Sequence, residues 1–294
     1  MGPSASPAHF VAQLFSRETA ALLRASTVAR TTRDPEGVHQ ARVASRRLRA
    51  EINLLADVLD PRWCAHLERE LAHFGRLLGR CRDLDVVTAH LGTVARGDPA
   101  LDTSVITHLR ARRDALGPRL NAALASHRYR TLLSRLVDGS LSPSLGTVPA
   151  DWPTPLVTRW RTRWDTVAAA LESPPTSEQL HALRIATKRA RYASEVLDAL
   201  VGGLQPVLDR ASAAQDHLGL LHDQTVTSAL VADWYRSPAA ARGVDPGDAI
   251  ESWARALRMD PPHPHRWLDP LNEALVLVEE RRRDLERGPE PTRG

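Results

Sequence analysis

Two short segments of this chain each place a histidine ahead of a series of cations, with the same spacing in both. In each segment the histidine is followed by a basic residue three, seven, eight and ten positions later, and no acidic residue interrupts the series. Imidazole, guanidinium and ammonium N–H groups donate charge-assisted hydrogen bonds to anionic oxygens. The repeated pattern therefore predicts a duplicated site for a strongly anionic ligand.

Helical geometry gathers most of these cations on one face. Each residue of an α-helix turns by about 100°, so residues three or four positions apart are neighbours. The first basic stripe consists of His39, Arg42, Arg46 and Arg49, and the second basic stripe consists of His181, Arg184, Lys188 and Arg191. Apolar residues such as Leu48 and Leu183 fall on the opposite faces, which predicts two amphipathic helices. Arg47 and Arg189 turn to the flank of each stripe.

A second pair of matched segments follows the stripes at nearly constant distance. Asp83, in LGRCRDLDVV, lies 44 residues after His39, and Asp223, in LGLLHDQTV, lies 42 residues after His181. The repeated unit is therefore a helical hairpin, and its period of about 140 residues is too long for a small solenoid repeat. We expect Asp83, Asp85 and Asp223 to orient arginines or to form ion pairs within each hairpin.

The rest of the chain has helical periodicity and no alternating β-branched runs, so we predict an all-α fold. The expected helices span residues 6–30, 37–59, 62–92, 102–117, 119–137, 155–171, 177–200, 205–236, 246–258 and 268–287. Prolines disfavour helix interiors, so Pro61, Pro118 and Pro206 are expected at helix starts or between helices.

The domain organisation follows from the repeat and from one change in composition. Residues 138–155 are rich in Gly, Ser and Pro, which indicates a linker between the repeats. We predict a single domain over residues 1–285, made of two pseudo-symmetric antiparallel helical bundles at about 8–138 and 155–285. A frayed tail is expected at 286–294.

Composition describes a globular chain with strong local positive charge. The formal net charge is +4 and the pI is about 9.6, while 43% of the residues are hydrophobic. Lys188 is the only lysine among 39 basic residues. No apolar run is long enough to span a membrane, and the two cysteines, Cys64 and Cys81, are too few for a disulfide framework. We therefore expect a cytoplasmic protein with polyanionic partners and two buried thiols.

These residues resemble the CHAD domain, an all-helical family. The resemblance covers roughly residues 8–285 and rests on four segments in the expected order: VHQARVASRRLR, LGRCRDLDVV, LHALRIATKRARYASEVL and QDHLGLLHD. It implies two helical bundles around a basic central channel that binds inorganic polyphosphate without catalysis, at polyphosphate granules. The CYTH-type triphosphatase domain that often accompanies the family has no counterpart here. The resemblance thus implies no catalytic residue, cofactor or metal.

Carried over by position, the family's binding residues match the eight residues of the two stripes. Further candidates beside them are Arg47, Arg189, Arg82, Arg130 and Tyr192. The two halves also differ. Ala50 and Asn53 stand in the first half where the second half has Tyr192 and Glu195, and Arg82 is replaced by His222. These differences predict that the two halves are not functionally identical.

Two other functions fit parts of the sequence. A nucleic-acid binder is permitted by the charge, but the stripes offer only Tyr192 for base stacking, and no known nucleic-acid-binding motif is present. A metal-dependent HD-type phosphohydrolase would use the dipeptide His222-Asp223 with His181 and either Asp233 or Asp245. We favour polyphosphate or another oligophosphate anion, because a chain of phosphates needs a line of cations and no base-reading groups.

Overall fold

The computed structural model describes residues 6–32, 34–172, 177–237, 245–258 and 268–287. Within these residues the chain forms helices and no strand, apart from one isolated bridge between Leu59 and Leu145, which confirms the all-α prediction. The helices are α1 (Pro7–Thr31), α2 (Pro35–Leu54), α3 (Pro61–Gly97), α4 (Ser104–Ala125), α5 (His127–Leu141), α6 (Pro153–Ala169), α7 (Ser177–Val201), α8 (Gln205–Tyr235), α9 (Pro246–Arg258) and α10 (Leu268–Arg287). None of these described helices is both long and apolar enough to cross a membrane.

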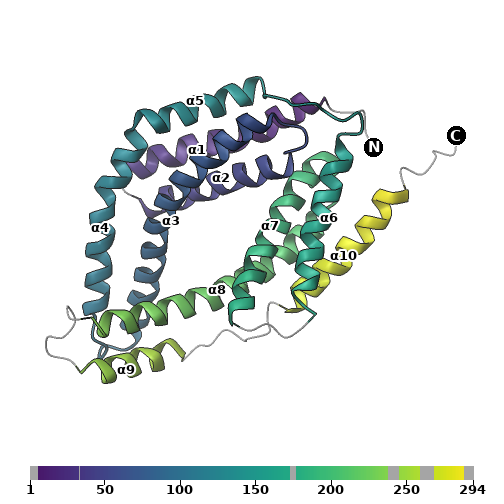
Figure 1. Cartoon of the computed structure of the whole chain (residues 1–294). Helices are drawn as coiled ribbons and strands as arrows, with labels where there is room; N and C mark the ends of the chain where they lie inside the picture. The colour runs from purple at the N-terminus through teal and green to yellow at the C-terminus, as the bar shows by residue number, and fades with distance from the viewer. Residues whose placement is uncertain (1–5, 33, 173–176, 238–244, 259–267, 288–294) are drawn as a thin grey trace.

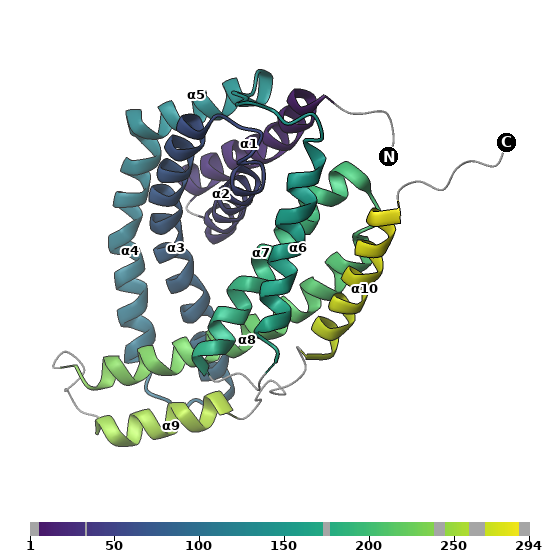
Figure 2. The ribbon, with the colours of Figure 1, turned by 45° about the vertical axis from the view of Figure 1, so that its right-hand side comes forward.

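The helices outline a four-sided frame (Figure 1). One side is formed by α1, α2 and α5, the next by α3 and α4, the third by α8 and α9, and the fourth by α6, α7 and α10. Turning the molecule shows that the helices of each side stay together (Figure 2). The long helices α3 and α8 each pass from one side into another, because α3 packs against α2 and α4, and α8 packs against α7, α10 and α9.

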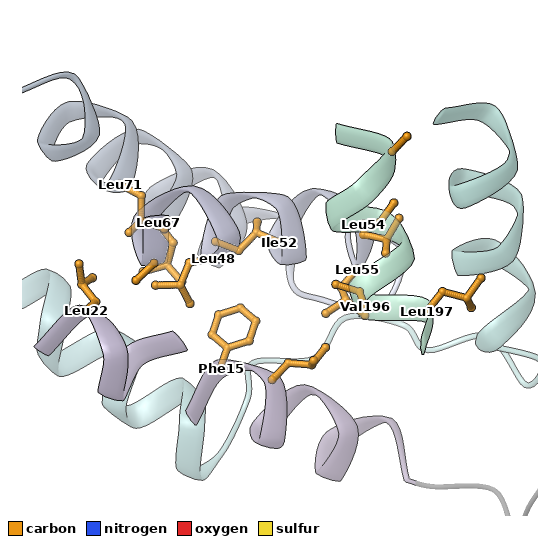
Figure 3. Packing of buried hydrophobic residues seen from close by; sticks show 14 of the residues in the cluster. Phe15, Leu22, Leu48, Ile52, Leu54, Leu55, Leu67, Leu71, Val196 and Leu197 are labelled. Atoms are coloured by element: carbon orange, nitrogen blue, oxygen red, sulfur yellow. The ribbon is translucent and has the colours of Figure 1, made fainter. Parts of the chain in front are cut away.

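One large hydrophobic core joins the two halves through α2 and α7. Leu48 and Ile52 of α2 are fully buried above Phe15 of α1, and Leu55 lies beside Val196 of α7 (Figure 3). Burying such side chains stabilises the folded state by about 1.5–3 kcal/mol each. The shared core, to which α2 and α7 both contribute, therefore holds these two helices in contact and with them the position of both basic stripes.

A second core lies at the opposite junction of the halves. Apolar side chains from the last part of α3 and from α4 pack there against the last part of α8 and against α9. The buried Trp253 of α9 donates from Nε1 to the carbonyl oxygen of Asp102 at 3.0 Å, and the Tyr235 hydroxyl of α8 lies 2.8 Å from an Asp102 carboxylate oxygen. The two halves are thus fixed to each other at two places.

Helix starts follow the expected use of proline. Pro35 begins α2, where the Asp34 side chain accepts from Glu36 N at 2.8 Å, and Pro61 begins α3, where Asp60 accepts from Trp63 N at 2.8 Å. These caps satisfy backbone donors that have no partner within the helix. Pro206 lies in the first turn of α8, as predicted.

The prediction for Pro118 was wrong. Pro118 lies inside α4, which continues to Ala125, and the break falls at Ser126. Pro118 and Asp114, whose carbonyl loses its helical donor, are both exposed, so water can satisfy that carbonyl. Ser126 offers a better helix start, because its hydroxyl accepts from Tyr129 N at 3.1 Å. The helix break therefore follows the cap rather than the proline.

The connection between the halves is shorter than the predicted linker. It runs from the end of α5 at Leu141 to the start of α6 at Pro153 and packs on the α2–α3 turn, where Gly146 N donates to Val58 O at 2.9 Å. At the other end of the chain, α10 ends at Arg287, where we expected the last helix to end, so residues 286 and 287 are helical; residues 288–294 of the expected tail lie outside the described part. Cys64 and Cys81 are buried and unpaired, as predicted.

Candidate anion-binding site

The two basic stripes lie on α2 and α7, the helices that join the halves. Opposite the stripes, Leu48 in α2 and Leu183 in α7 are fully buried, so both helices are amphipathic as the sequence predicts. Arg46 and Lys188, at equivalent positions of the two stripes, are half-buried. The apolar packing of α2 and α7 thus holds two rows of cations at the same junction.

The charges of the two stripes influence one another. Burial and, after it, the neighbouring cations Arg46, Arg184, Arg42 and Arg191 together lower the pKa of Lys188 to about 7. Two of these arginines belong to α2 and two to α7. Because like charges oppose protonation only when they are close, the structure brings the stripes together. The prediction of a shared location for both stripes therefore agrees with the geometry.

Tyr192 lies between the stripes. Its buried ring has the Arg46 guanidinium of α2 at 5.5 Å from the ring centroid and the Arg191 guanidinium of α7 at 4.7 Å. Such cation–π contacts hold arginine planes in fixed orientations. Burial also lowers the pKa of Arg46, so this guanidinium has lost part of its hydration. An incoming anion would replace that lost water.

Two arginine donors of the stripes have no partner. The Nε atoms of Arg46 and Arg184 are buried and make no hydrogen bond within the described part of the chain. Buried N–H groups are nearly always hydrogen-bonded in proteins, so a buried donor without a partner, called an orphan donor below, needs an explanation. One such donor belongs to each stripe. An anionic oxygen beside each Nε would satisfy these donors.

The histidines that begin the stripes face the partner helices. The pKa of His39 is lowered by burial and then by Arg82 of α3. His181 lies with its Nδ1 atom 3.4 Å from Nδ1 of His222 in α8. The pKa of His222 is lowered by burial, then by Arg184 and then by His181. Arg82 and His222, which occupy equivalent sequence positions, therefore extend the stripes onto α3 and α8.

In the first half, an arginine closes the space between the stripe and α3. Arg42 donates from Nη1 to Asp83 Oδ1 at 2.8 Å, which confirms the expected orienting role of Asp83. Its guanidinium lies against Gly79, where a Cβ atom would meet Arg42 Nη1 at 3.0 Å. Glycine at position 79 thus lets the cation approach the helix backbone. Asp85 pairs with Arg113 of α4 at 2.7 Å, so it orients an arginine that lies outside the α2–α3 hairpin.

In the second half, the equivalent space is open. No ion pair between Arg184 and Asp223 is found in the described structure, and nothing lies within 4 Å of a Cβ built on Gly219. A pocket of about 340 Å³ occupies the position, lined by Arg184, Lys188, Gln215, Asp216, Gly219, Leu220 and Asp223.

Sequence reasoning missed Gln215 and Asp216. Their spacing of four and three residues before Gly219, on one face of α8, is the signal that could have found them.

Arg191 and Arg47 are drawn into ion pairs. Arg191 pairs with Glu195 one turn along α7 and donates to Gln215 Oε1 at 3.0 Å. Arg47 lies on the flank, as predicted, with Nε 3.2 Å from Glu195 Oε2. Glu195 therefore joins α2 to α7. Both arginines hold the junction in place and have less free charge for a ligand than Arg46 or Arg184.

The remaining candidates are not all gathered at the junction. Arg49 is exposed, one turn beyond Arg46. Arg189 faces α6, where the pKa of Arg163 is lowered by burial and then by Arg189. Arg130 lies at the start of α5 and donates to Ala125 O at 2.8 Å. The structure thus separates Arg189 and Arg130 from the two stripes.

A second hollow, of about 470 Å³, lies between α3 and α4. Among its lining residues are Arg82, Arg96, Arg110 and Arg113, together with Asp85 and Asp114. Arg82 connects this hollow to the first stripe, because it also acts on His39. Arg110 and Arg113 of α4 therefore adjoin the first stripe through this hollow.

The described residues include no group of three His, Cys, Asp or Glu side chains arranged to hold a metal ion. His181 and His222 approach each other, but neither Asp233 nor Asp245 completes a ligand set with them. An HD-type centre needs such a cluster, and here cations surround the histidines instead. The arrangement is suited to binding an anion by charge and hydrogen bonding.

Comparison with known proteins agrees with this class of basic, all-helical binding fold. The family model of the CHAD domain matches residues 13–232, and the chain belongs to the CHAD domain family. The crystal structure of the CHAD domain from the plant Ricinus communis is similar, with a TM-score of 0.68 and 22% identity over 94% of this chain and 93% of that chain. PptA from Streptomyces chartreusis has a TM-score of 0.65 and 19% identity over 96% of this chain and 99% of that chain. No curated protein matches the chain.

Proposed function

We propose that this protein binds inorganic polyphosphate, without catalysing its turnover, at the junction of α2 and α7. The observation that carries the proposal is the pair of orphan donors, Arg46 Nε and Arg184 Nε, one in each stripe. Together with Lys188 they offer three half-buried cationic groups, and both arginines are close enough to Lys188 to lower its pKa. CHAD domains are known as polyphosphate-binding domains, which supports the choice of ligand.

A linear phosphate chain suits the arrangement because the cations continue in two directions. From the junction, the first stripe leads through His39 to Arg82, and the second leads through Arg184 to His222. A chain with negative charge on every phosphate can contact cations all along such a path, whereas a single phosphate can occupy only one part of it. We further propose that this path forms a basic channel. We also propose that the protein acts in the cytoplasm, at polyphosphate granules.

A titration with polyphosphates of graded length, at two salt concentrations, tests the proposal. We expect affinity to rise with chain length until the chain spans both stripes, and then to level off. Each phosphate contact releases bound counterions, so higher salt should weaken long chains more than short ones. A length-independent affinity equal to that of orthophosphate would contradict the proposal.

Competition separates polyphosphate from nucleic acid. The Tyr192 ring is buried beneath two arginines, so it is not available for stacking with a base. We therefore expect polyphosphate to displace a labelled oligonucleotide at a far lower phosphate concentration than the oligonucleotide needs to displace polyphosphate. The reverse order would favour a nucleic-acid binder. Phosphate release from polyphosphate in the presence of Mg²⁺ or Mn²⁺ would instead indicate an enzyme.

A further inference from the structure

Lys188 has a chemical environment unlike that of an ordinary lysine. It is the only lysine of the chain, it is half-buried, and it lines the open pocket of about 340 Å³ in the second half. No ion pair to its amine is found among the described residues, although Asp216 and Asp223 line the same pocket. A lysine held near a cavity without a carboxylate partner has a free amine to offer to a ligand in that cavity.

The charged groups that face Lys188 come from three helices. Arg42 and Arg46 approach from α2, and Arg184 and Arg191 lie before and after it on α7. From α8, Asp216, Asp223 and His222 face the same pocket or the adjoining Arg184. The cations of α2 and α7 therefore form a basic wall for a small anion, opposite Asp216 and Asp223 of α8, and they favour the neutral form of the Lys188 amine.

We propose that Lys188 is a covalent modification site for acyl phosphates, whose phosphate group occupies the pocket while the acyl carbon is presented to the Lys188 amine. The inference rests on the proposed function in one respect, that the cations which hold polyphosphate also hold the phosphate of the acyl donor. Arg184, which lines the pocket and has an orphan Nε, would bind this phosphate, and Arg46 approaches Lys188 from α2 beside it.

The reaction is a simple acyl transfer. The nitrogen lone pair of neutral Lys188 attacks the carbonyl carbon and forms a C–N bond, and the C–O bond to the phosphate breaks. The phosphate leaves with that electron pair as inorganic phosphate, and the ammonium proton passes to water. The nearby arginines stabilise the negative charge of the leaving phosphate. The product is an uncharged amide at Lys188, with no oxidant or further reactant required.

Modification would oppose polyphosphate binding. The amide removes one of the central cations, and the acyl group occupies part of the pocket. Polyphosphate and acyl phosphate would also compete for the same donors, so bound polyphosphate would protect Lys188. Acylation and polyphosphate binding are therefore mutually exclusive states of this site.

The presence of a single lysine makes the test direct. At pH 7.5 an ordinary lysine is only about 0.1% free amine and reacts far more slowly than an α-amino group. Burial and the nearby cations lower the pKa of Lys188 to about 7, which leaves most of it neutral at that pH. The full chain would be incubated with acetyl phosphate, and acetylation at Lys188 and at the α-amino group would be followed by peptide mass spectrometry.

We expect Lys188 to be acetylated about tenfold faster than the α-amino group. With the neutral donor N-acetoxysuccinimide the preference should fall at least threefold, because the arginines no longer position the donor. Long-chain polyphosphate should suppress acetylation of Lys188 but not of the α-amino group. Arg184→Ala, checked for helicity by circular dichroism, should lower the preference for Lys188 over the α-amino group when acetyl phosphate is the donor. With N-acetoxysuccinimide the variant should show no such loss.

Acetylation of Lys188 by acetyl phosphate no faster than the α-amino group would overturn the inference. So would an equal preference with the neutral donor, since the phosphate would then have no role. The outcome is independent of the polyphosphate titration on unmodified protein. If polyphosphate binds and Lys188 does not react preferentially, only this inference fails. If Lys188 reacts preferentially and polyphosphate does not bind, only the proposed function fails.

Discussion

The matched glycines Gly79 and Gly219 have different surroundings in the two halves of the molecule. Against Gly79 lies the Arg42 guanidinium, paired with Asp83 at 2.8 Å, whereas the space beside Gly219 is open and Arg184 is left with an orphan Nε. The two halves thus have the same residue types at these positions but differ in whether the arginine is paired with a carboxylate. One arginine is neutralised within the protein, and its counterpart is free for a ligand. The second half should therefore contribute more to anion binding.

Charge reversal in both stripes should have the largest effect. We expect Arg46→Glu combined with Lys188→Glu to weaken polyphosphate binding by at least about 100-fold, because it replaces two central cations with anions. Helicity measured by circular dichroism should be retained. Arg24→Glu with Arg255→Glu is the matched control, since it changes net charge equally on α1 and α9, which carry no stripe residue. Similar losses in the two double variants would mean that only net charge matters.

Replacing Arg42 or Arg184 by alanine should measure how much the two halves differ in anion binding. We expect Arg184→Ala to weaken polyphosphate binding by about tenfold and Arg42→Ala by about threefold, because Asp83 already compensates part of the Arg42 charge. Isothermal titration of both variants with one polyphosphate length makes the comparison. Equal losses would show that the Arg42–Asp83 pair opens when the ligand arrives and that the two halves act alike.

Polyphosphate binding should take up protons through Lys188. A bound polyanion favours the protonated amine, so it raises the pKa of Lys188 above its value of about 7 in the free protein. The contribution of Lys188 to binding is then complete below pH 7 and is lost as the pH rises through the pKa in the complex. We expect affinity to fall about fivefold between pH 6.5 and 8.5. Titrations in buffers of different ionisation enthalpy would detect the proton uptake.

The matched variant for this prediction is Lys188→Arg. Arginine stays charged over the whole range, so the pH dependence above 7 should largely disappear in the variant. His39 and His222, whose pKa values are also lowered in the free protein, would still contribute below about pH 6.5. Proton release on binding, or an unchanged pH dependence in Lys188→Arg, would contradict the expected role of Lys188.

Releasing the paired arginine should have the smallest effect. Asp83→Asn removes the charge that holds Arg42, and we expect polyphosphate affinity to rise about threefold as the first half becomes more like the second. Asp57→Asn is the control, because Asp57 forms a comparable pair with Arg159 at 2.7 Å away from the stripes. An increase in both variants would reflect net charge alone, and no increase in either would mean that Arg42 does not reach the ligand.

The sequence predicts the helices and the faces of the stripes, because both depend on local spacing. The expected position of Arg47 on the flank and the pairing of Asp83 agree with the structure for this reason. The helix break at Ser126 was not predicted, since the rule used for Pro118 ignored exposure and capping. The difference between Arg42 and Arg184 could not be predicted, because the two arginines share residue type and spacing.

The environment of Lys188 could not be predicted from the sequence either. Its lowered pKa depends on burial and on Arg46 and Arg42, which α2 supplies from about 140 residues earlier in the chain. Spacing within α7 places Arg184 and Arg191 near Lys188, but only the packing of α2 on α7 brings the other two arginines. Long-range contacts of this kind decide which cations share a site.

A crystal structure of the protein with a polyphosphate chain long enough to span both stripes would show directly whether one chain occupies the α2–α7 junction. We predict continuous density for one chain across the α2–α7 junction, with phosphoryl oxygens within hydrogen-bond distance of Arg46 Nε and Arg184 Nε. Density confined to another surface, with both Nε atoms still unpartnered, would contradict the account.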